Sequence, residues 1–170
     1  MLVRATITIA VLLAVAIAGL YVWTRTHPTR LRSQTEISAP PAAVWKVLTD
    51  FASYPEWNPF IVSAEGEPRA GARLTNKLSN RGGTMTFKPK VLVAKPGEEL
   101  RWIGRFGVPG IVDGEHYFLL EEIEGGRTRL VQGETFTGVL VPFAGGAIQV
   151  EDGFAAMNAA LKARVEKMAG

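Results

Sequence analysis

The segment VEDGFAAMNAALKARVEKM, residues 150–168, decides the fold that the sequence predicts. Its large apolar residues recur every three or four positions, which places them on one side of an α-helix. They are Phe154, Met157, Leu161, Val165 and Met168, and the stripe is widened by Ala155, Ala156, Ala159, Ala160 and Ala163. Gly153 weakens the start of this helix, so the sequence leaves its first residue open between 147 and 154. We therefore predict one long C-terminal helix with an apolar face to bury.

The region before this helix predicts strands. Apolar and polar residues alternate in six runs separated by glycine and proline, at residues 61–67, 72–78, 84–94, 98–106, 111–123 and 128–137, with a turn at 80–83. A short first strand at 33–38 precedes two short helices, because Pro41 suits the first turn of a helix and two later prolines stop the second. We therefore predict an α+β fold in which a curved antiparallel sheet of about seven strands surrounds the C-terminal helix. Such a sheet leaves room for a pocket.

The last two strands place a histidine and a glutamate together. A three-residue turn at 124–126 pairs residues whose numbers sum to about 250, which sets His116 opposite Glu134. The same register sets Phe118 opposite Gln132 and Leu120 opposite Leu130. A carboxylate beside an imidazole can prepare it for proton transfer, or the pair can anchor a ligand hydroxyl or carbonyl. The structural alternative is an ordinary cross-strand hydrogen bond at the rim of a cavity.

Residues 5–23 carry no charge over 19 positions and as a helix would reach about 28 Å at ~1.5 Å per residue, close to the thickness of a bilayer core. They predict a membrane anchor or a signal peptide, since residues 16–18 (AIA) offer small residues at cleavage spacing. Tyr21, Trp23 and Arg25 suit an interfacial boundary, so we favour an uncleaved anchor. We expect residues 1–33 to be anchor and linker, with 24–32 exposed, and residues 34–170 to be one soluble domain.

Composition excludes several classes of function. The chain has no cysteine, and a net charge of +3 from 19 basic and 16 acidic residues. Four of the arginines (Arg4, Arg25, Arg30 and Arg32) precede residue 34, and without them 15 basic residues face 16 acidic ones, a net −1. The basic residues after the span favour a cytoplasmic domain only slightly over the opposite side. With one histidine in the domain, no phosphate-loop motif and no basic cluster, we expect no metal, no cofactor and no nucleic-acid partner.

Several motifs resemble one protein family. They are residues 37–40 (ISAP), 44–45 (VW), 48–50 (LTD), 54–60 (YPEWNPF), 114–118 (GEHYF), 128–130 (TRL) and 134–138 (ETFTG). These motifs are similar to those of the polyketide cyclase/dehydrase branch of the SRPBCC, or START-like, helix-grip superfamily, and the resemblance covers about residues 34–168. The resemblance implies an incomplete antiparallel barrel that grips the final helix, with a hydrophobic cavity between them. It does not fix the function, because the superfamily includes lipid carriers, hormone receptors, aromatic cyclases and co-chaperone domains.

We expect the cavity to be lined by aromatic and apolar side chains with a few polar anchors. The candidate ligand-binding residues are Trp57, Phe60, Phe87, Trp102, Phe106, His116, Phe118, Glu134, Phe136 and Met157. The leading hypothesis is a membrane-tethered domain that binds a small hydrophobic molecule, a lipid or an aromatic, polyketide-like compound. One alternative is a cyclase or dehydratase with His116 as acid/base and Glu134 orienting it. The other is a protein-interaction module of the co-chaperone type, which would have a filled core.

Overall fold

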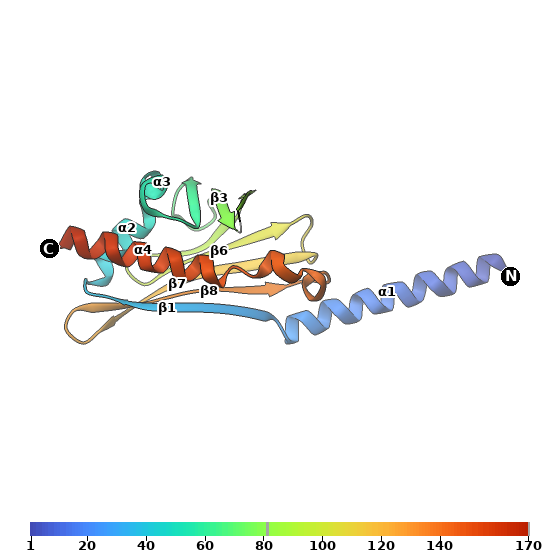
Figure 1. Ribbon diagram of the computed structural model, residues 1–170. Coiled ribbons are helices and arrows are strands. Elements are labelled where there is room, and N and C mark those ends of the chain that lie inside the picture. The colour runs from blue at the N-terminus through green and yellow to red at the C-terminus, as the bar shows by residue number, and fades with distance from the viewer. Residues whose placement is uncertain (81, 170) are drawn as a thin grey trace.

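The computed structural model describes residues 1–80 and 82–169, with one long helix projecting from a domain of strands and helices (Figure 1). Helix α1 (Leu2–Thr26) leads into strand β1 (Thr29–Ile37), which is followed by α2 (Pro41–Thr49), the 3₁₀ turn η1 (Phe51–Ser53) and α3 (Tyr54–Trp57). Seven strands come next: β2 (Ile61–Glu65), β3 (Thr75–Asn80), β4 (Gly83–Phe87), β5 (Lys90–Lys95), β6 (Glu99–Phe106), β7 (Val112–Ile123) and β8 (Arg127–Thr137). The 3₁₀ turns η2 (Val141–Phe143) and η3 (Gly145–Ile148) then lead into α4 (Glu151–Ala169).

The strands form two antiparallel sheets, one of five strands in the order β1-β8-β7-β6-β5 and one of three in the order β2-β3-β4. Residues 72–74 join the sheets, because the Leu74 N–H donates to the Pro89 carbonyl at 2.9 Å and the Val91 N–H donates to the Ala72 carbonyl at 2.8 Å. The α+β helix-grip fold is thus confirmed. The single strand predicted at residues 84–94 is wrong: Pro89 has no N–H for a ladder, and the chain divides there into β4 and β5.

The hairpin of β7 and β8 has the predicted register. His116 pairs with Glu134, Phe118 with Gln132 and Leu120 with Leu130. The predicted turn at residues 80–83 joins β3 to β4, and its Arg81 lies outside the described residues. The glycine-containing turn between β7 and β8 therefore fixes which side chains of the two longest strands face the interior.

Helix α4 lies against the five-stranded sheet and runs alongside β1 (Figure 1), and it buries four of the five predicted large residues, with Phe154, Met157 and Leu161 fully enclosed. It begins at Glu151, and Gly153 permits a close approach, because a Cβ there would collide with the ring of Phe60. The apolar stripe that the sequence predicts for this helix is wider than the face that the structure buries. Met168 is 62% exposed, and four of its alanines (Ala155, Ala156, Ala159 and Ala163) face solvent along one side of the helix.

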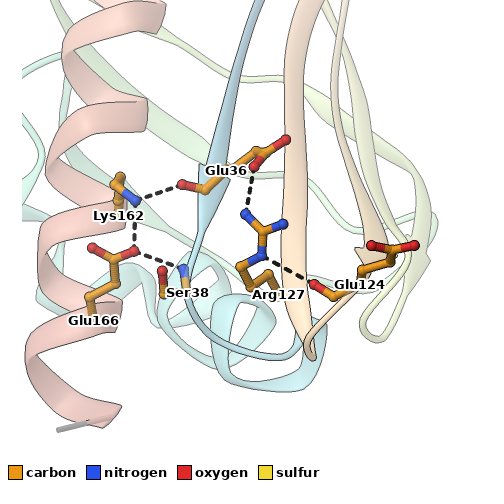
Figure 2. Close-up of polar contacts among 6 residues, drawn as sticks. All are labelled: Glu36, Ser38, Glu124, Arg127, Lys162 and Glu166. Carbon is orange, nitrogen blue, oxygen red and sulfur yellow. Dashed lines mark hydrogen bonds and ion pairs between the residues drawn. The ribbon is translucent and has the colours of Figure 1, made fainter.

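The C-terminal half of α4 is fixed to the end of β1 by polar contacts that Figure 2 shows. The Lys162 ammonium donates to the Glu36 carbonyl at 2.7 Å and to the Glu166 carboxylate at 2.7 Å. The same Glu166 oxygen accepts from the Ser38 backbone N–H at 2.7 Å. Helix and edge strand are therefore joined by charge-assisted hydrogen bonds as well as by apolar packing.

Helix α1 is exposed along most of its length and is long and apolar enough to cross a membrane, although a signal sequence near an N-terminus has the same properties. The linker predicted at residues 24–32 is wrong. Thr24 is a buried residue in the last turn of α1. Only His27 and Pro28 separate the helix from β1, and Leu31 is already buried in the domain. The Gly138 N–H of the domain donates to the Thr24 hydroxyl at 3.1 Å, so α1 is attached to the domain without a flexible spacer.

Candidate functional site

A cavity of about 270 Å³ is lined by β3, β4 and the adjoining ends of β6, β7 and β8, and Phe60, Ile61, Pro89 and Val150 complete its wall. Most of its surface is apolar. Seven of the ten residues that the sequence proposes as ligand contacts line it: Phe60, Phe87, Trp102, Phe106, His116, Glu134 and Phe136. The volume lies just below the range for small-molecule sites, roughly 300–1,000 Å³. The mouth is on the side where Thr84, Met85 and Arg105 are exposed.

The other three proposed residues do not line the cavity. Phe118 is fully buried and packs against the rings of His116 and Trp102. Met157 is fully buried beneath the cavity, on α4. Trp57 lies in α3 and is half-buried, with its indole N–H donating to the Ser53 hydroxyl at 3.2 Å. Phe118 and Met157 support the site from behind, whereas Trp57 belongs to the packing of the short helices.

His116 is enclosed by aromatic rings. Its imidazole stacks on Trp102 with the ring centroids 4.9 Å apart and the planes within 5°. Phe118 and Phe154 approach the same ring with centroids at 4.9 and 5.0 Å. The residue is only 4% exposed, so the surrounding rings restrict its orientation.

Glu134 lies beside the imidazole as the predicted register requires. Its Oε2 is 3.3 Å from His116 Nδ1, and the carboxylate lines the cavity. Gly114 makes room for it, because a Cβ at position 114 would collide with the Glu134 carboxylate and approach the Phe136 ring. The absence of a side chain at position 114 therefore allows the carboxylate to reach the histidine.

Gln132 completes a buried polar row that sequence reasoning did not assign to the site. Its amide nitrogen lies 3.2 Å from His116 Nε2 and 3.6 Å from the Met157 sulfur. With the imidazole neutral and protonated at Nδ1, the ring donates to Glu134 and accepts from Gln132, so both nitrogens are paired. The signal was present in the hairpin register, which placed Gln132 on the same face two positions from Glu134.

Asn76 is a second polar residue that the sequence reading passed over. It lines the cavity, is 2% exposed, and its Oδ1 has no hydrogen-bond partner among the described residues. It stands between Leu74, just before β3, and Leu78 in β3, two apolar residues on the same face of the alternating run, and this alternation was the available signal. A buried amide oxygen without a partner lowers stability, and this oxygen itself has almost no surface open to the cavity.

The site contains polar groups for orientation and one pair able to move a proton. Among the described residues, no three His, Cys, Asp or Glu side chains lie close enough to hold a metal ion. The polar residues that line the cavity include His116, Glu134 and Asn76, and they face an apolar wall. Such an arrangement can bind and orient a small apolar molecule through a few polar contacts, or exchange a proton with it.

Fold and site together define a helix-grip domain with a mostly apolar cavity and one polar cluster inside it. The chain belongs to the family described as "Polyketide cyclase / dehydrase and lipid transport", which matches residues 28–166. This finding confirms the superfamily resemblance seen in the sequence, and it supports a ligand-binding or cyclase role. Among curated proteins, none matches the chain.

Solved structures support the fold. The Zhui aromatase/cyclase from Streptomyces sp. R1128 is similar with a TM-score of 0.69 and 17% identity, over 85% of this chain and 97% of that one. A START superfamily protein from Mycobacterium smegmatis gives a TM-score of 0.64 and 20% identity, over 82% and 98% of the two chains. The protein TTHA0849 from Thermus thermophilus gives 0.65 and 18%, over 84% and 100%. At these identities the likeness shows a shared fold.

Proposed function

We propose that this chain binds a small hydrophobic molecule, a lipid or an aromatic, polyketide-like compound, beside a membrane in which α1 is anchored. The observation that carries the proposal is the apolar cavity with few polar groups in its wall. A co-chaperone type of interaction module would be expected to fill this space with side chains, so the cavity counts against that alternative.

The wall suggests the chemistry of the ligand. At about 270 Å³ the cavity is larger than the roughly 150 Å³ that holds a benzene molecule, so it suits a compact ring system or a folded acyl chain. The Glu134 carboxylate lines the cavity and accepts a hydrogen bond from a donor such as a hydroxyl or an amine. We therefore propose a mostly apolar ligand with at least one hydroxyl.

We propose that α1 remains as an uncleaved anchor. Its length and composition suit a bilayer, and Tyr21 and Trp23 stand where a span leaves the hydrocarbon. We propose an N-terminal anchor followed by a START-like domain that begins with β1 at Thr29 rather than at residue 34, because β1 pairs with β8 from Thr29 onward. The slight excess of arginine after the span favours the cytoplasmic side.

The test compares compounds extracted from the wild-type chain and from a variant with a filled cavity. Gly104 lines the cavity, and a Cβ there meets no atom closer than the Gly114 carbonyl at 4.0 Å, so Gly104→Leu adds volume where space exists. Both proteins are purified in the same lipid nanodiscs, extracted with organic solvent and compared by mass spectrometry. We expect a compound enriched in the wild type, while bilayer lipids appear equally in both. Equal extracts would contradict ligand binding in this cavity.

The second candidate function is a cyclase or dehydratase, favoured by the contact of His116 with Glu134 inside the cavity. In that mechanism His116 removes or returns a proton on the substrate, and Glu134 holds the ring in place. The variant His116→Gln keeps a polar side chain and loses the acid/base group. If the chain is an enzyme, the compound bound to the variant should differ from the wild-type compound by a chemical step such as loss of one water. The same compound in both would leave binding as the function.

A further inference from the structure

Exposed apolar side chains gather at the end of the domain where α1 is attached. Phe106 and Val108, at the end of β6 and in the following loop, are 61% and 65% exposed. Leu140, just before η2, is 49% exposed, and Phe143, in η2, is 72% exposed. We call these four residues the apolar end. Outside α1, they account for most of the large exposed hydrophobic residues that the structure describes, and residues of this kind in one place mark an interaction surface.

Both segments of the apolar end are attached to the last turns of α1. The Thr24 hydroxyl accepts a hydrogen bond from the Gly138 N–H, two residues before Leu140. A Cβ built on Gly110, two residues after Val108, would lie 3.1 Å from the Tyr21 ring. The apolar end therefore lies at the level of residues 21–24 of the helix, where aromatic residues mark the membrane interface.

We propose that the apolar end inserts into the interfacial layer of the same bilayer that α1 crosses, and that the mouth of the ligand cavity is thereby held against the lipid. This inference rests on the proposed function, which supplies the anchor and the ligand. The occupant of the surface is a lipid bilayer because the surface is continuous with α1. A protein partner at this place would have to occupy the headgroup region around the helix.

The cavity adjoins the apolar end. Phe106 both lines the cavity and belongs to the apolar end, and the exposed Met85 of β4 stands on the cavity wall. The lining residues of β6, β7 and β8 come from the ends of those strands nearest α1, as the strands run in Figure 1. A poorly soluble ligand would therefore pass between bilayer and cavity without crossing bulk water.

The only cation among the residues lining this cavity, within residues 1–80 and 82–169, is Arg105, which stands beside Phe106. Its Nε lies 3.5 Å from Asp113 Oδ1, and its side chain is 43% exposed. An arginine at the membrane interface can place its guanidinium among lipid phosphates while its aliphatic side chain lies along apolar surface. The charge at the mouth therefore agrees with an interface that contains lipid headgroups.

The test uses the full chain, which has no cysteine of its own. Single variants Val108→Cys and Phe143→Cys carry the environment-sensitive dye NBD, and Glu124→Cys serves as the control. Glu124 is exposed in the β7–β8 turn, at the opposite end of strands about 35 Å long. The proteins are reconstituted in phosphatidylcholine–phosphatidylglycerol vesicles with and without nitroxide-labelled lipid.

We expect a blue shift and lipid quenching of NBD at positions 108 and 143, and neither at position 124. A further pair of proteins carries the dye at position 140. The single variant Leu140→Cys should show the blue shift, and adding Val108→Asp and Phe143→Asp to it should abolish that shift. Flotation of the vesicles separates the possible failures. Protein that floats while the dyes at 108 and 143 stay in water overturns this inference and leaves the anchor standing. Protein that does not float overturns both the membrane anchor and this inference. Blue-shifted dyes on a chain without extractable ligand overturn only the proposed ligand binding.

Discussion

At the scale of single residues, two glycines that pair across β6 and β7 differ in what they tolerate. Gly104 and Gly114 are opposite each other and both line the cavity. A Cβ on Gly114 would collide with the Glu134 carboxylate, whereas a Cβ on Gly104 meets open space. We expect Gly114→Ala to lower the free energy of unfolding by about 1–3 kcal/mol, because overpacking forces neighbours to move. The matched Gly104→Ala should change it by less than about 0.5 kcal/mol.

Denaturant unfolding followed by tryptophan fluorescence measures both glycine variants. Because the Gly114→Ala methyl displaces the carboxylate, the nuclear magnetic resonance signals of the His116 ring should also shift in that variant and stay in place for Gly104→Ala. Equal losses of stability in the two variants would contradict the predicted crowding of position 114 by the Glu134 carboxylate.

Tyr54 gives the residue-scale prediction for alkaline pH. Its phenol is fully buried and donates to the Leu48 carbonyl at 2.7 Å. Burial, and secondarily the charge of Asp50, raise the pKa of Tyr54 far above its usual value. The unfolded chain releases this proton near pH 10 and the folded chain retains it, so stability is complete below pH 10 and falls above it by up to about 1.4 kcal/mol per pH unit.

Tyr54→Phe removes that titration and tests it. We expect the variant to be less stable at pH 7 by about 1 kcal/mol, because one hydrogen bond is lost. Above pH 10 its stability should fall less steeply with pH than that of the wild type. Denaturant unfolding at a series of pH values measures the slopes, and parallel curves would contradict the assignment to Tyr54.

At the scale of elements, the sequence predicts strands well where a turn fixes their partner and poorly where only alternation is available. The three-residue turn after Ile123 set the β7–β8 register, and with it the pairing of His116 with Glu134. The alternation of residues 84–94 gave no sign that Pro89 would end one ladder and accept a hydrogen bond from another segment. Likewise, alanine in α4 is small enough to face either core or solvent, so the width of the buried stripe could not be predicted.

The contact of α4 with β1 supports an element-scale prediction (Figure 2). The Glu166 carboxylate accepts from Lys162 and from the Ser38 N–H, and these hydrogen bonds hold the pKa of Glu166 below its usual value. The stability that this provides is present above the unfolded-state pKa, near pH 4.3, and is lost as the pH falls through the lower folded-state value. Because the group is partly exposed, we expect Glu166→Gln to cost only about 0.5 kcal/mol at pH 7.

The Glu166→Gln difference should disappear on acidification below the folded-state pKa, which thermal unfolding at a series of pH values would show. The control Glu67→Gln breaks the exposed pair with Arg69 and leaves α4 untouched, so it should leave stability unchanged at each pH. A difference between Glu166→Gln and the wild type that persists in acid would assign the effect to packing rather than to charge.

At the scale of the whole molecule, the attachment of α1 is the feature least visible in the sequence. Residues 24–32 are rich in arginine and contain a proline, a composition typical of an exposed linker. In the structure Arg30 and Arg32 are exposed residues of the edge strand β1, with Leu31 between them in the core. One apolar residue between two charges is too short a pattern to predict a strand, because the pairing with β8 that fixes it is supplied by residues more than a hundred positions away.

The same attachment yields a prediction about which part of α1 belongs to the folded domain. The Gly138 N–H is buried and donates to Thr24, and Tyr21 lies against Gly110, so the last two turns of α1 act as part of the domain. A chain that begins at Gly19, as a signal-peptide cleavage after Ala18 would leave it, keeps these contacts. A chain that begins at Pro28 loses them. Water can then reach the Gly138 N–H, so we expect the chain that begins at Pro28 to be less stable than the chain that begins at Gly19 by about 0.5–1.5 kcal/mol in denaturant unfolding.

Thr24→Val separates the hydrogen bond from the bulk of the helix. In the chain that begins at Gly19, this variant keeps the helical turn and its shape but leaves the Gly138 N–H buried without an acceptor, which should cost about 1–3 kcal/mol. Thr24→Ser retains the hydroxyl and should stay close to the unchanged chain. If the chains that begin at Gly19 and Pro28 unfold at the same denaturant concentration, α1 is only tethered to the domain, and the geometry that brings the apolar end to the bilayer loses its basis.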